Sequence, residues 1–124
     1  MVDFIDVMDH RSFKRFPVCH NGRFFSTGQN AGWRECTIID VSRKGILITC
    51  PLSEKIAVGA TVCLEIYVPK QMDPVNAKGT VKWVKETKHA VVSGIELCKL
   101  LDEDLVSKLN WRDPSLMAHQ LKSS

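Results

Sequence analysis

Hydrophobic and polar residues alternate over much of this 124-residue chain, with short polar or Gly/Pro-containing breaks between the alternating runs. The clearest run is "TVCLEIYVP", in which Val62, Leu64, Ile66 and Val68 fall on one face of a strand. "ECTIIDV" and "GILITCP" flank a polar stretch, and "VNAKGTVKWV" and "AVVSGIEL" follow further along. Together with "FPVCHNGRFF" near the N-terminus, these runs predict about six short strands between residues 16 and 98.

Two local patterns within these runs give more specific expectations. The Asn21-Gly22 pair, flanked by apolar residues, is typical of a tight hairpin turn. In "VNAKGTVKWV", strict alternation puts Trp83 on the same face as Val81. We therefore expect Trp83 in the core or at a barrel mouth, with ligand contact as its second possible role.

Beyond residue 100 the apolar residues change to helical spacing. They recur at Leu101, Leu105, Val106 and Leu109. Asp102 suits the N-cap of this helix, and Pro114 is expected to end it. The leucine face of the helix is expected to cover one mouth of a barrel.

Short strands joined by brief loops favour a closed barrel, because closure removes the unpaired edges that an open sheet exposes. The sequence thus predicts an all-β dominated fold, a six-stranded antiparallel β-barrel with a C-terminal α-helix. We divide the chain into a leader at 1–9, a barrel with its arginine-bearing lead-in at 10–101, the helix at 102–113 and a tail at 114–124.

Composition excludes several classes of protein. Hydrophobic residues make up 44% of the chain and charged residues 25%, which is typical of soluble globular domains. No apolar run approaches the roughly 20 residues of a membrane-spanning helix. The acidic N-terminus also lacks the pattern of a secretory signal. We therefore expect a cytoplasmic protein whose five cysteines stay reduced.

The sequence offers no pattern for catalysis or for metal binding. It has no Ser/His/Asp order, no pair of convergent carboxylates and no His/Cys spacing suited to zinc. We predict no catalytic residue, no metal site and no cofactor.

Positive charge is concentrated in one part of the chain. The net charge is only +3, yet residues 10–45 carry seven cations against two acids. The rest of the chain is slightly acidic, with ten cations against twelve acids. A positive region made by one stretch of sequence favours a compact anionic partner over a long nucleic-acid duplex.

The first motif of this positive region is "RSFKR", which places Arg11 and Arg15 four residues apart. Pro17 restricts the chain after them to an extended conformation, so the segment is interpreted as a flexible lead-in to the first strand. Guanidinium groups can stack on aromatic bases and donate paired hydrogen bonds to phosphate or to a guanine edge.

The second motif is a D-x-S-x-x-G spacing in "IIDVSRKGILI", where a polar turn is expected from Asp40 to Gly45. The Asp40 carboxylate can accept hydrogen bonds from the paired N–H groups of a guanine edge. Ser42 adds a hydroxyl, and Gly45 permits a positive φ and a close backbone approach. Together the two motifs predict a pocket for guanine and phosphate.

In this order the two motifs resemble the PilZ domain, a bacterial receptor family for the second messenger cyclic di-GMP. The resemblance covers roughly residues 10–110 and extends to "RSFKRFPV", "CTIIDVSRKGILI", "GTVKWV" and "SGIEL" before the helix. It implies a PilZ-like barrel with the ligand on its outside and the arginine-bearing lead-in folded over the ligand.

The resemblance also implies a role for each motif residue. Arg11 and Arg15 would grip guanine faces and phosphates, Asp40 would read a guanine edge, Ser42 would assist and Gly45 would shape the turn. Second-rank ligand contacts are His10, Lys14, Arg43 and Trp83. Ligand binding would order the lead-in and relay the signal to an unidentified protein partner in control of motility, exopolysaccharide or virulence.

Two other functions stay open. Basic residues beside aromatic ones, at Phe16, Phe24, Phe25 and Trp33, suit a small barrel that binds single-stranded nucleic acid, a partner that we favour less. The other function is that of a PilZ-like adaptor, which has lost ligand binding and acts through protein contacts.

Overall fold

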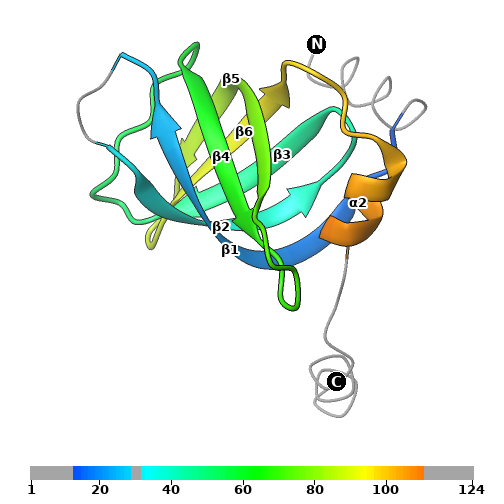
Figure 1. Ribbon diagram of the computed structural model, residues 1–124. Helices are drawn as coiled ribbons and strands as arrows, with labels where there is room; N and C mark the ends of the chain where they lie inside the picture. The colour runs from blue at the N-terminus through cyan, green and yellow to red at the C-terminus, as the bar shows by residue number, and fades with distance from the viewer. Residues whose placement is uncertain (1–12, 29–31, 111–124) are drawn as a thin grey trace.

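The computed structural model describes residues 13–28 and 32–110, which form a closed six-stranded antiparallel β-barrel and one short helix (Figure 1). The elements are β1 (Phe16–Ser26), β2 (Arg34–Val41), β3 (Gly45–Cys50), β4 (Thr61–Tyr67), β5 (Val75–Glu86), β6 (Val91–Leu97) and α2 (Glu103–Leu109). Around the barrel the strand order is β1-β2-β3-β6-β5-β4, and β4 pairs back to β1. The predicted fold class is confirmed.

Alternating side chains build the core of the barrel. In β4, Val62, Leu64 and Ile66 are buried, whereas the residues between them are partly exposed. The same alternation in the other strands produces one interior cluster, whose most deeply buried side chains include Phe24, Ile38, Ile46 and Ile48. Burying one such side chain contributes about 1.5–3 kcal/mol, so alternation fixes which face of each strand points inward.

The expectation of a turn at Asn21-Gly22 is wrong. Strand β1 runs through both residues, and Asn21 pairs with Thr37 on β2. Gly22 lies where β1 comes close to β4, because a Cβ at this position would be 2.7 Å from the backbone oxygen of Glu65. This close approach, and not a hairpin, explains the glycine.

A β-bulge in β5 changes the direction of Trp83. Val81 pairs with Ile95 and Trp83 pairs with Gly94, so Lys82 is an extra residue without a partner position on β6. The bulge turns Trp83 outward, where 43% of the residue is exposed. The expected core position of Trp83 is therefore wrong.

Helix α2 packs its apolar side onto the barrel. It begins at the predicted N-cap, Asp102, whose carboxylate accepts a backbone N–H of the first turn at 2.8 Å. At its other end Leu109 is fully buried, and His20 Nε2 donates a hydrogen bond to the Leu109 backbone oxygen. The helix ends there with Asn110 as the C-cap, and residues 111–113 of the expected helix lie outside the described residues.

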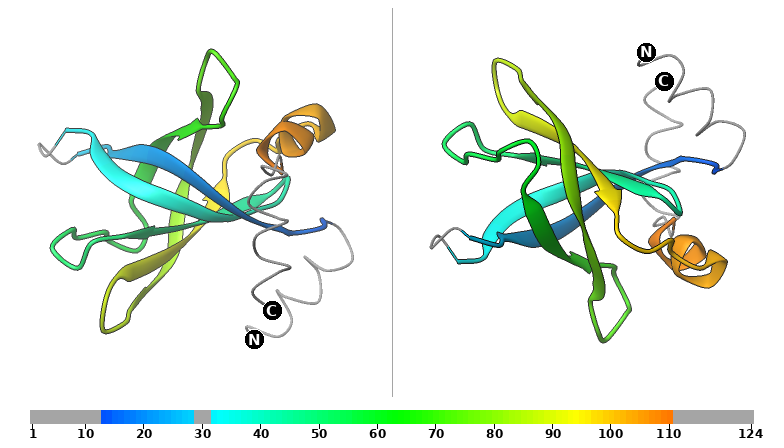
Figure 2. Two further views of the ribbon diagram at one scale, coloured as in Figure 1. Left: turned by 90° about the horizontal axis from the view of Figure 1, so that it is seen from below. Right: turned by 90° about the horizontal axis from the view of Figure 1, so that it is seen from above.

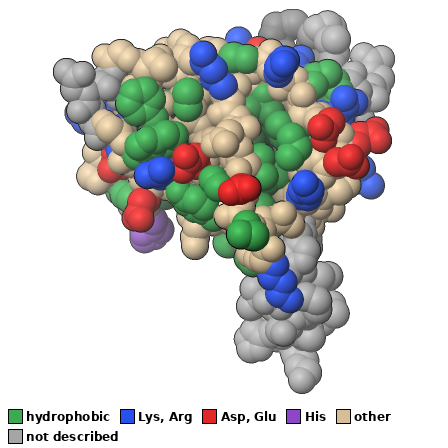
Figure 3. All heavy atoms as spheres, viewed as in Figure 1, with side chains coloured by type: hydrophobic (Ala, Val, Ile, Leu, Met, Phe, Trp, Pro, Cys, Tyr) green, Lys and Arg blue, Asp and Glu red, His purple; other side chains and the backbone are tan. Residues whose placement is uncertain are grey.

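The surface of the described residues is mixed in character. On the face shown in Figure 3, basic, acidic and hydrophobic side chains are interspersed, with acidic ones gathered over α2, which carries Glu103 and Asp104 in its first turn. Within the described ranges, no helix has the length and apolar character needed to cross a membrane.

Candidate functional site

One row of paired residues crosses four strands on the outside of the barrel and continues to β1. Pro17 pairs with Asp40, Asp40 with Leu47, Leu47 with Gly94, and Gly94 with Trp83. We call these five residues the outer row. Three strand spacings separate Asp40 from Trp83, which is roughly 14 Å. The expected contacts Asp40 and Trp83 thus share one face, although they are far apart in sequence.

The Trp83 end of the outer row presents an aromatic surface. A Cβ at position 94 would lie 2.2 Å from Nε1 and 2.5 Å from Cε2 of the Trp83 indole, so the ring lies directly against the Gly94 backbone. Only glycine leaves room for the ring in this position. The remaining exposed surface of the indole is available for stacking against a flat ligand.

The Asp40 end of the outer row combines a cation with a poorly solvated carboxylate. Arg15 Nε lies 3.6 Å from Asp40 Oδ1, and 37% and 24% of the two side chains are exposed. This distance makes an ion pair but exceeds a hydrogen bond, and Asp40 Oδ1 is buried with no hydrogen-bond partner among residues 13–28 and 32–110. Burial raises the pKa of Asp40 above its usual value, and the nearby Arg15 only partly opposes this.

An acceptor atom that is shielded from water and lacks a donor is energetically unfavourable. A ligand that brought N–H donors to Asp40 would remove that cost. The carboxylate can therefore accept a donor group, and the Arg15 guanidinium beside it can pair with an anionic group.

The turn between β2 and β3 is shorter than predicted, because Asp40 and Val41 belong to β2. Ser42 is buried, and its Oγ accepts the N–H groups of Lys44 at 3.2 Å and Gly45 at 3.0 Å. The Ser42 hydroxyl therefore stabilises the turn that follows Asp40.

Gly45 has a different explanation from the one expected. Its φ is not positive, unlike that of Gly28, Gly32 and Gly59. A Cβ at Gly45 would lie 3.1 Å from the backbone oxygen of Ile95, so close approach to β6 favours glycine here.

The second-rank cations make contacts within the protein. Arg43 Nε donates to the Leu101 backbone oxygen at 2.8 Å, and its Cζ lies 5.9 Å from the centre of the Phe13 ring. Lys14 Nζ lies 5.6 Å from the Phe16 ring. Of the other expected contacts, His10 and Arg11 lie outside the described residues.

Sequence reasoning missed several residues in the outer row and beside it. Leu47 and Gly94 lie in its centre, and only the strand register reveals them. Beside it, Glu96 forms ion pairs with Lys44 at 3.8 Å and with Lys82 at 4.0 Å. The quoted "SGIEL" pattern contains Gly94 and Glu96, so that run was the available signal.

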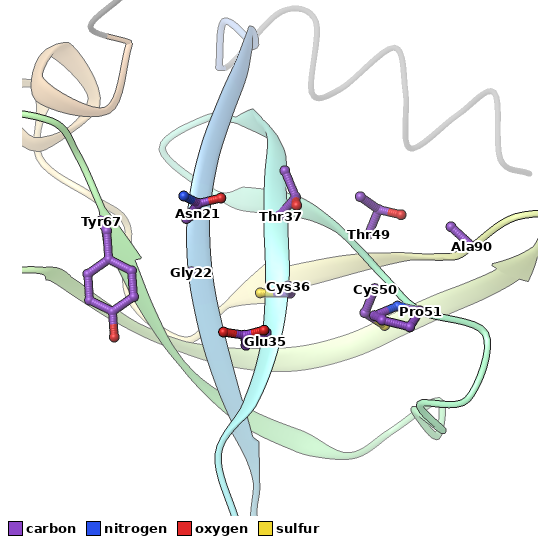
Figure 4. A pocket seen from close by; sticks show the side chains of 10 residues that line it. All are labelled: Asn21, Gly22, Glu35, Cys36, Thr37, Thr49, Cys50, Pro51, Tyr67 and Ala90. Atoms are coloured by element: carbon purple, nitrogen blue, oxygen red, sulfur yellow. The ribbon is translucent and has the colours of Figure 1, made fainter.

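A separate groove of about 600 Å³ lies across β1, β2 and β3 (Figure 4). It is lined by Asn21, Gly22, Glu35, Cys36, Thr37, Thr49, Cys50, Pro51, Tyr67 and Ala90. None of the expected ligand contacts is among these residues. We place the candidate site at the outer row because the Arg15–Asp40 ion pair and the exposed Trp83 lie on the same face there. Elsewhere too, the described residues contain no cluster of three or more His, Cys, Asp or Glu side chains that could hold a metal ion.

Comparisons with solved structures support the same fold. The inhibitor of motility MotI/DgrA from Bacillus subtilis superposes with a TM-score of 0.62 at 14% identity, over 90% of this chain and 52% of that one. PlzA from Borreliella burgdorferi, solved in complex with c-di-GMP, gives a TM-score of 0.52 at 12% identity, over 86% of this chain and 43% of that one. The chain thus spans about half the length of these two proteins.

Sequence comparison gives the family. A search of curated protein sequences found no match. The family model of the PilZ domain matches residues 9–111, which includes all six strands and α2. The chain therefore belongs to the PilZ domain family.

Proposed function

We propose that this protein is a receptor for cyclic di-GMP that binds the dinucleotide at the outer row and has no catalytic activity of its own. The observation that carries the proposal is the meeting of Arg15 and Asp40, 3.6 Å apart, at one end of a row that ends in the exposed Trp83. Membership in the PilZ family and the c-di-GMP complex of the structural neighbour PlzA support the choice of ligand.

The groups of the outer row match the chemistry of this ligand. Asp40 accepts hydrogen bonds from the N1–H and N2–H groups of one guanine. Arg15 binds a phosphate or stacks on a base, and Trp83 stacks on an aromatic face. Ser42 and Gly45 contribute by holding the turn that follows Asp40, as their contacts support.

Ligand binding also orders the lead-in in this proposal. Arg11 joins Arg15 on the ligand, and fixing each residue of the segment costs about 1–2 kcal/mol of backbone entropy. The ordered lead-in then forms a new surface for a protein partner in a bacterial cytoplasm.

Calorimetry with purified full-length protein and cyclic di-GMP tests the proposal. Arg15→Ala and Asp40→Ala are expected to lower the affinity on the order of 10-fold or more, because each removes a charged hydrogen-bonding partner worth about 1.5–3 kcal/mol. Arg23→Ala is the matched control, because Arg23 is held by Glu65 at 2.6 Å away from the outer row. A wild-type protein that binds nothing, or equal losses in all three variants, would refute the proposal.

Single-stranded nucleic acid is the second candidate, and one cluster favours it. Trp33 lies 5.8 Å from the Phe25 ring, and the Arg23 guanidinium lies 4.5 Å from the Trp33 ring. Glu65 neutralises this arginine, which weakens the case. Binding of an oligonucleotide with a steep salt dependence spread over many cations would favour this candidate over a dinucleotide receptor.

A further inference from the structure

The turn between β2 and β3 is hydrogen-bonded to the connection that leads into α2. The Leu97 N–H donates to the Lys44 backbone oxygen at 2.7 Å, and the Leu101 N–H donates to the Arg43 backbone oxygen at 2.8 Å. The Arg43 side chain adds a third bond, from Nε to the Leu101 oxygen at 2.8 Å. Leu101 is thus held by both the backbone and the side chain of Arg43.

Arg43 also faces the lead-in. Its guanidinium carbon lies 5.9 Å from the centre of the Phe13 ring, within the range of a cation–π contact. In both views of Figure 2 the β2–β3 turn lies between the start of β1 and α2. One side chain therefore touches the segment that carries Arg15 and the residue that precedes the N-cap of α2.

The far end of α2 is attached to the barrel independently. Leu109 is fully buried, and its backbone oxygen accepts the hydrogen bond from His20 on β1. Arg43 holds the beginning of the helix and His20 holds its end. A change at Arg43 can therefore loosen or tighten the first turn of α2 without detaching the helix.

We infer that Arg43 is a positioning residue that couples the order of the lead-in to the order of α2. This inference rests on the proposed function, because the ligand is what orders the lead-in. When Phe13 is fixed in place, its ring fixes the Arg43 guanidinium, and that group in turn fixes Leu101. Coupling of this kind is reciprocal, so a well-ordered α2 also favours ligand binding. In this inference Arg43 acts through Leu101, which accepts its Nε hydrogen bond, and through Phe13, and not by contact with the ligand.

Hydrogen exchange followed by mass spectrometry on residues 97–110, with and without cyclic di-GMP, tests the coupling. In the wild-type protein the ligand is expected to slow exchange of this segment roughly fivefold or more, the lower end of measured allosteric couplings. In Arg43→Ala the ligand still binds, but the exchange rate no longer responds. Arg43→Lys restores part of the response because lysine keeps a donor and a cation.

Lys44→Ala is the matched control, because it removes a cation from the same turn and, within the described part of the chain, breaks one side-chain ion pair, that with Glu96. It should respond to the ligand as the wild type does. An equal response in Arg43→Ala and in the wild type would overturn the inference, and so would loss of all ligand binding in Arg43→Ala, which would make Arg43 a ligand contact.

A ligand-free arm separates this inference from the proposed function. In the protein that keeps Arg43, Phe13→Ala is expected to speed hydrogen exchange at residues 97–110 roughly twofold or more. In the Arg43→Ala variant the same substitution should have no effect, because the two contacts are coupled. If wild-type protein bound no cyclic di-GMP, the proposed function would fail while this cycle still reported on Arg43. Equal effects of Phe13→Ala in both backgrounds would refute the coupling.

Discussion

Asp40→Asn should separate ligand binding from folding, because the two depend on this carboxylate in opposite ways. Asparagine has the same shape but no charge, and its NH₂ group cannot accept a hydrogen bond from guanine. Each hydrogen bond to a charged acceptor contributes about 1.5–3 kcal/mol. The amide oxygen can still accept one N–H, so at least one such bond is lost, which weakens binding of cyclic di-GMP on the order of 10- to 100-fold.

The free protein should not be destabilised by the same substitution. Arg15 is 3.6 Å away and partly exposed, and an ion pair of this kind contributes at most about 1 kcal/mol. Burial nevertheless raises the pKa of Asp40 above its usual value, so the charged form is less favourable in the folded than in the unfolded chain. At pH 7 we therefore expect Asp40→Asn to be at least as stable as the wild type.

The raised pKa of Asp40 also determines how the stability difference between Asp40→Asn and the wild type depends on pH. A group whose pKa is higher in the folded state destabilises the protein when it is ionised. The penalty is full above the raised pKa of Asp40 and disappears as the pH falls toward the ordinary value of 3.8. Ligand binding depends on the same titration. As the pH drops through this range Asp40 becomes protonated, and the affinity of the protein for cyclic di-GMP falls.

Urea unfolding of both proteins at pH 7 and at about pH 3.5, beside calorimetry at pH 7, measures these effects. The stability gain of Asp40→Asn should be present at pH 7 and absent at the lower pH. A variant that is less stable than the wild type at pH 7, but not at the lower pH, would show that the carboxylate stabilises the free barrel. A change in Kd of less than about fivefold, or about 1 kcal/mol, would show that Asp40 does not read the ligand.

Three further predictions concern other residues. Trp83→Leu should lower the affinity for cyclic di-GMP by about 1–3 kcal/mol in calorimetry, the usual contribution of one stacked base, whereas Trp33→Leu, equally exposed at 43%, should leave it unchanged. Gly79→Ala should lower the free energy of unfolding by at least about 1–3 kcal/mol in urea, because its Cβ would lie 2.4 Å from a backbone oxygen of β6. A disulfide reagent at pH 8 should label the exposed Cys19 in the folded protein, but Cys36, whose pKa burial raises to about 12, only after unfolding, as peptide mapping would show.

The features that could be predicted from the sequence are those that depend on neighbouring residues. The alternation of β4 is strict, and the N-cap of α2 is set by Asp102 and the turn that follows. The Asn21-Gly22 prediction failed because the deciding contact is remote. Glu65 is far along the chain, yet its backbone oxygen leaves no room for a side chain at Gly22.

The candidate site could be predicted only in part for the same reason. The motif spacing identified Arg15 and Asp40, which the structure brings within 3.6 Å of each other. It could not identify Leu47 or Gly94, because their place in the outer row depends on the pairing of β3 with β6. Nor could spacing show that Arg43 is bonded to the connection before α2.

Two β-bulges explain why the expected ligand contacts of the outer row face outward together. Ile38 is fully buried, so strict alternation would also turn Asp40 into the apolar barrel interior, at a prohibitive cost for a carboxylate. The register places one extra residue, Ile39, between them, as Lys82 is placed before Trp83. Each bulge reverses the alternation and turns the next residue outward. An acidic residue at an otherwise inward position is thus a sequence signal for a bulge, and "IIDV" contains it.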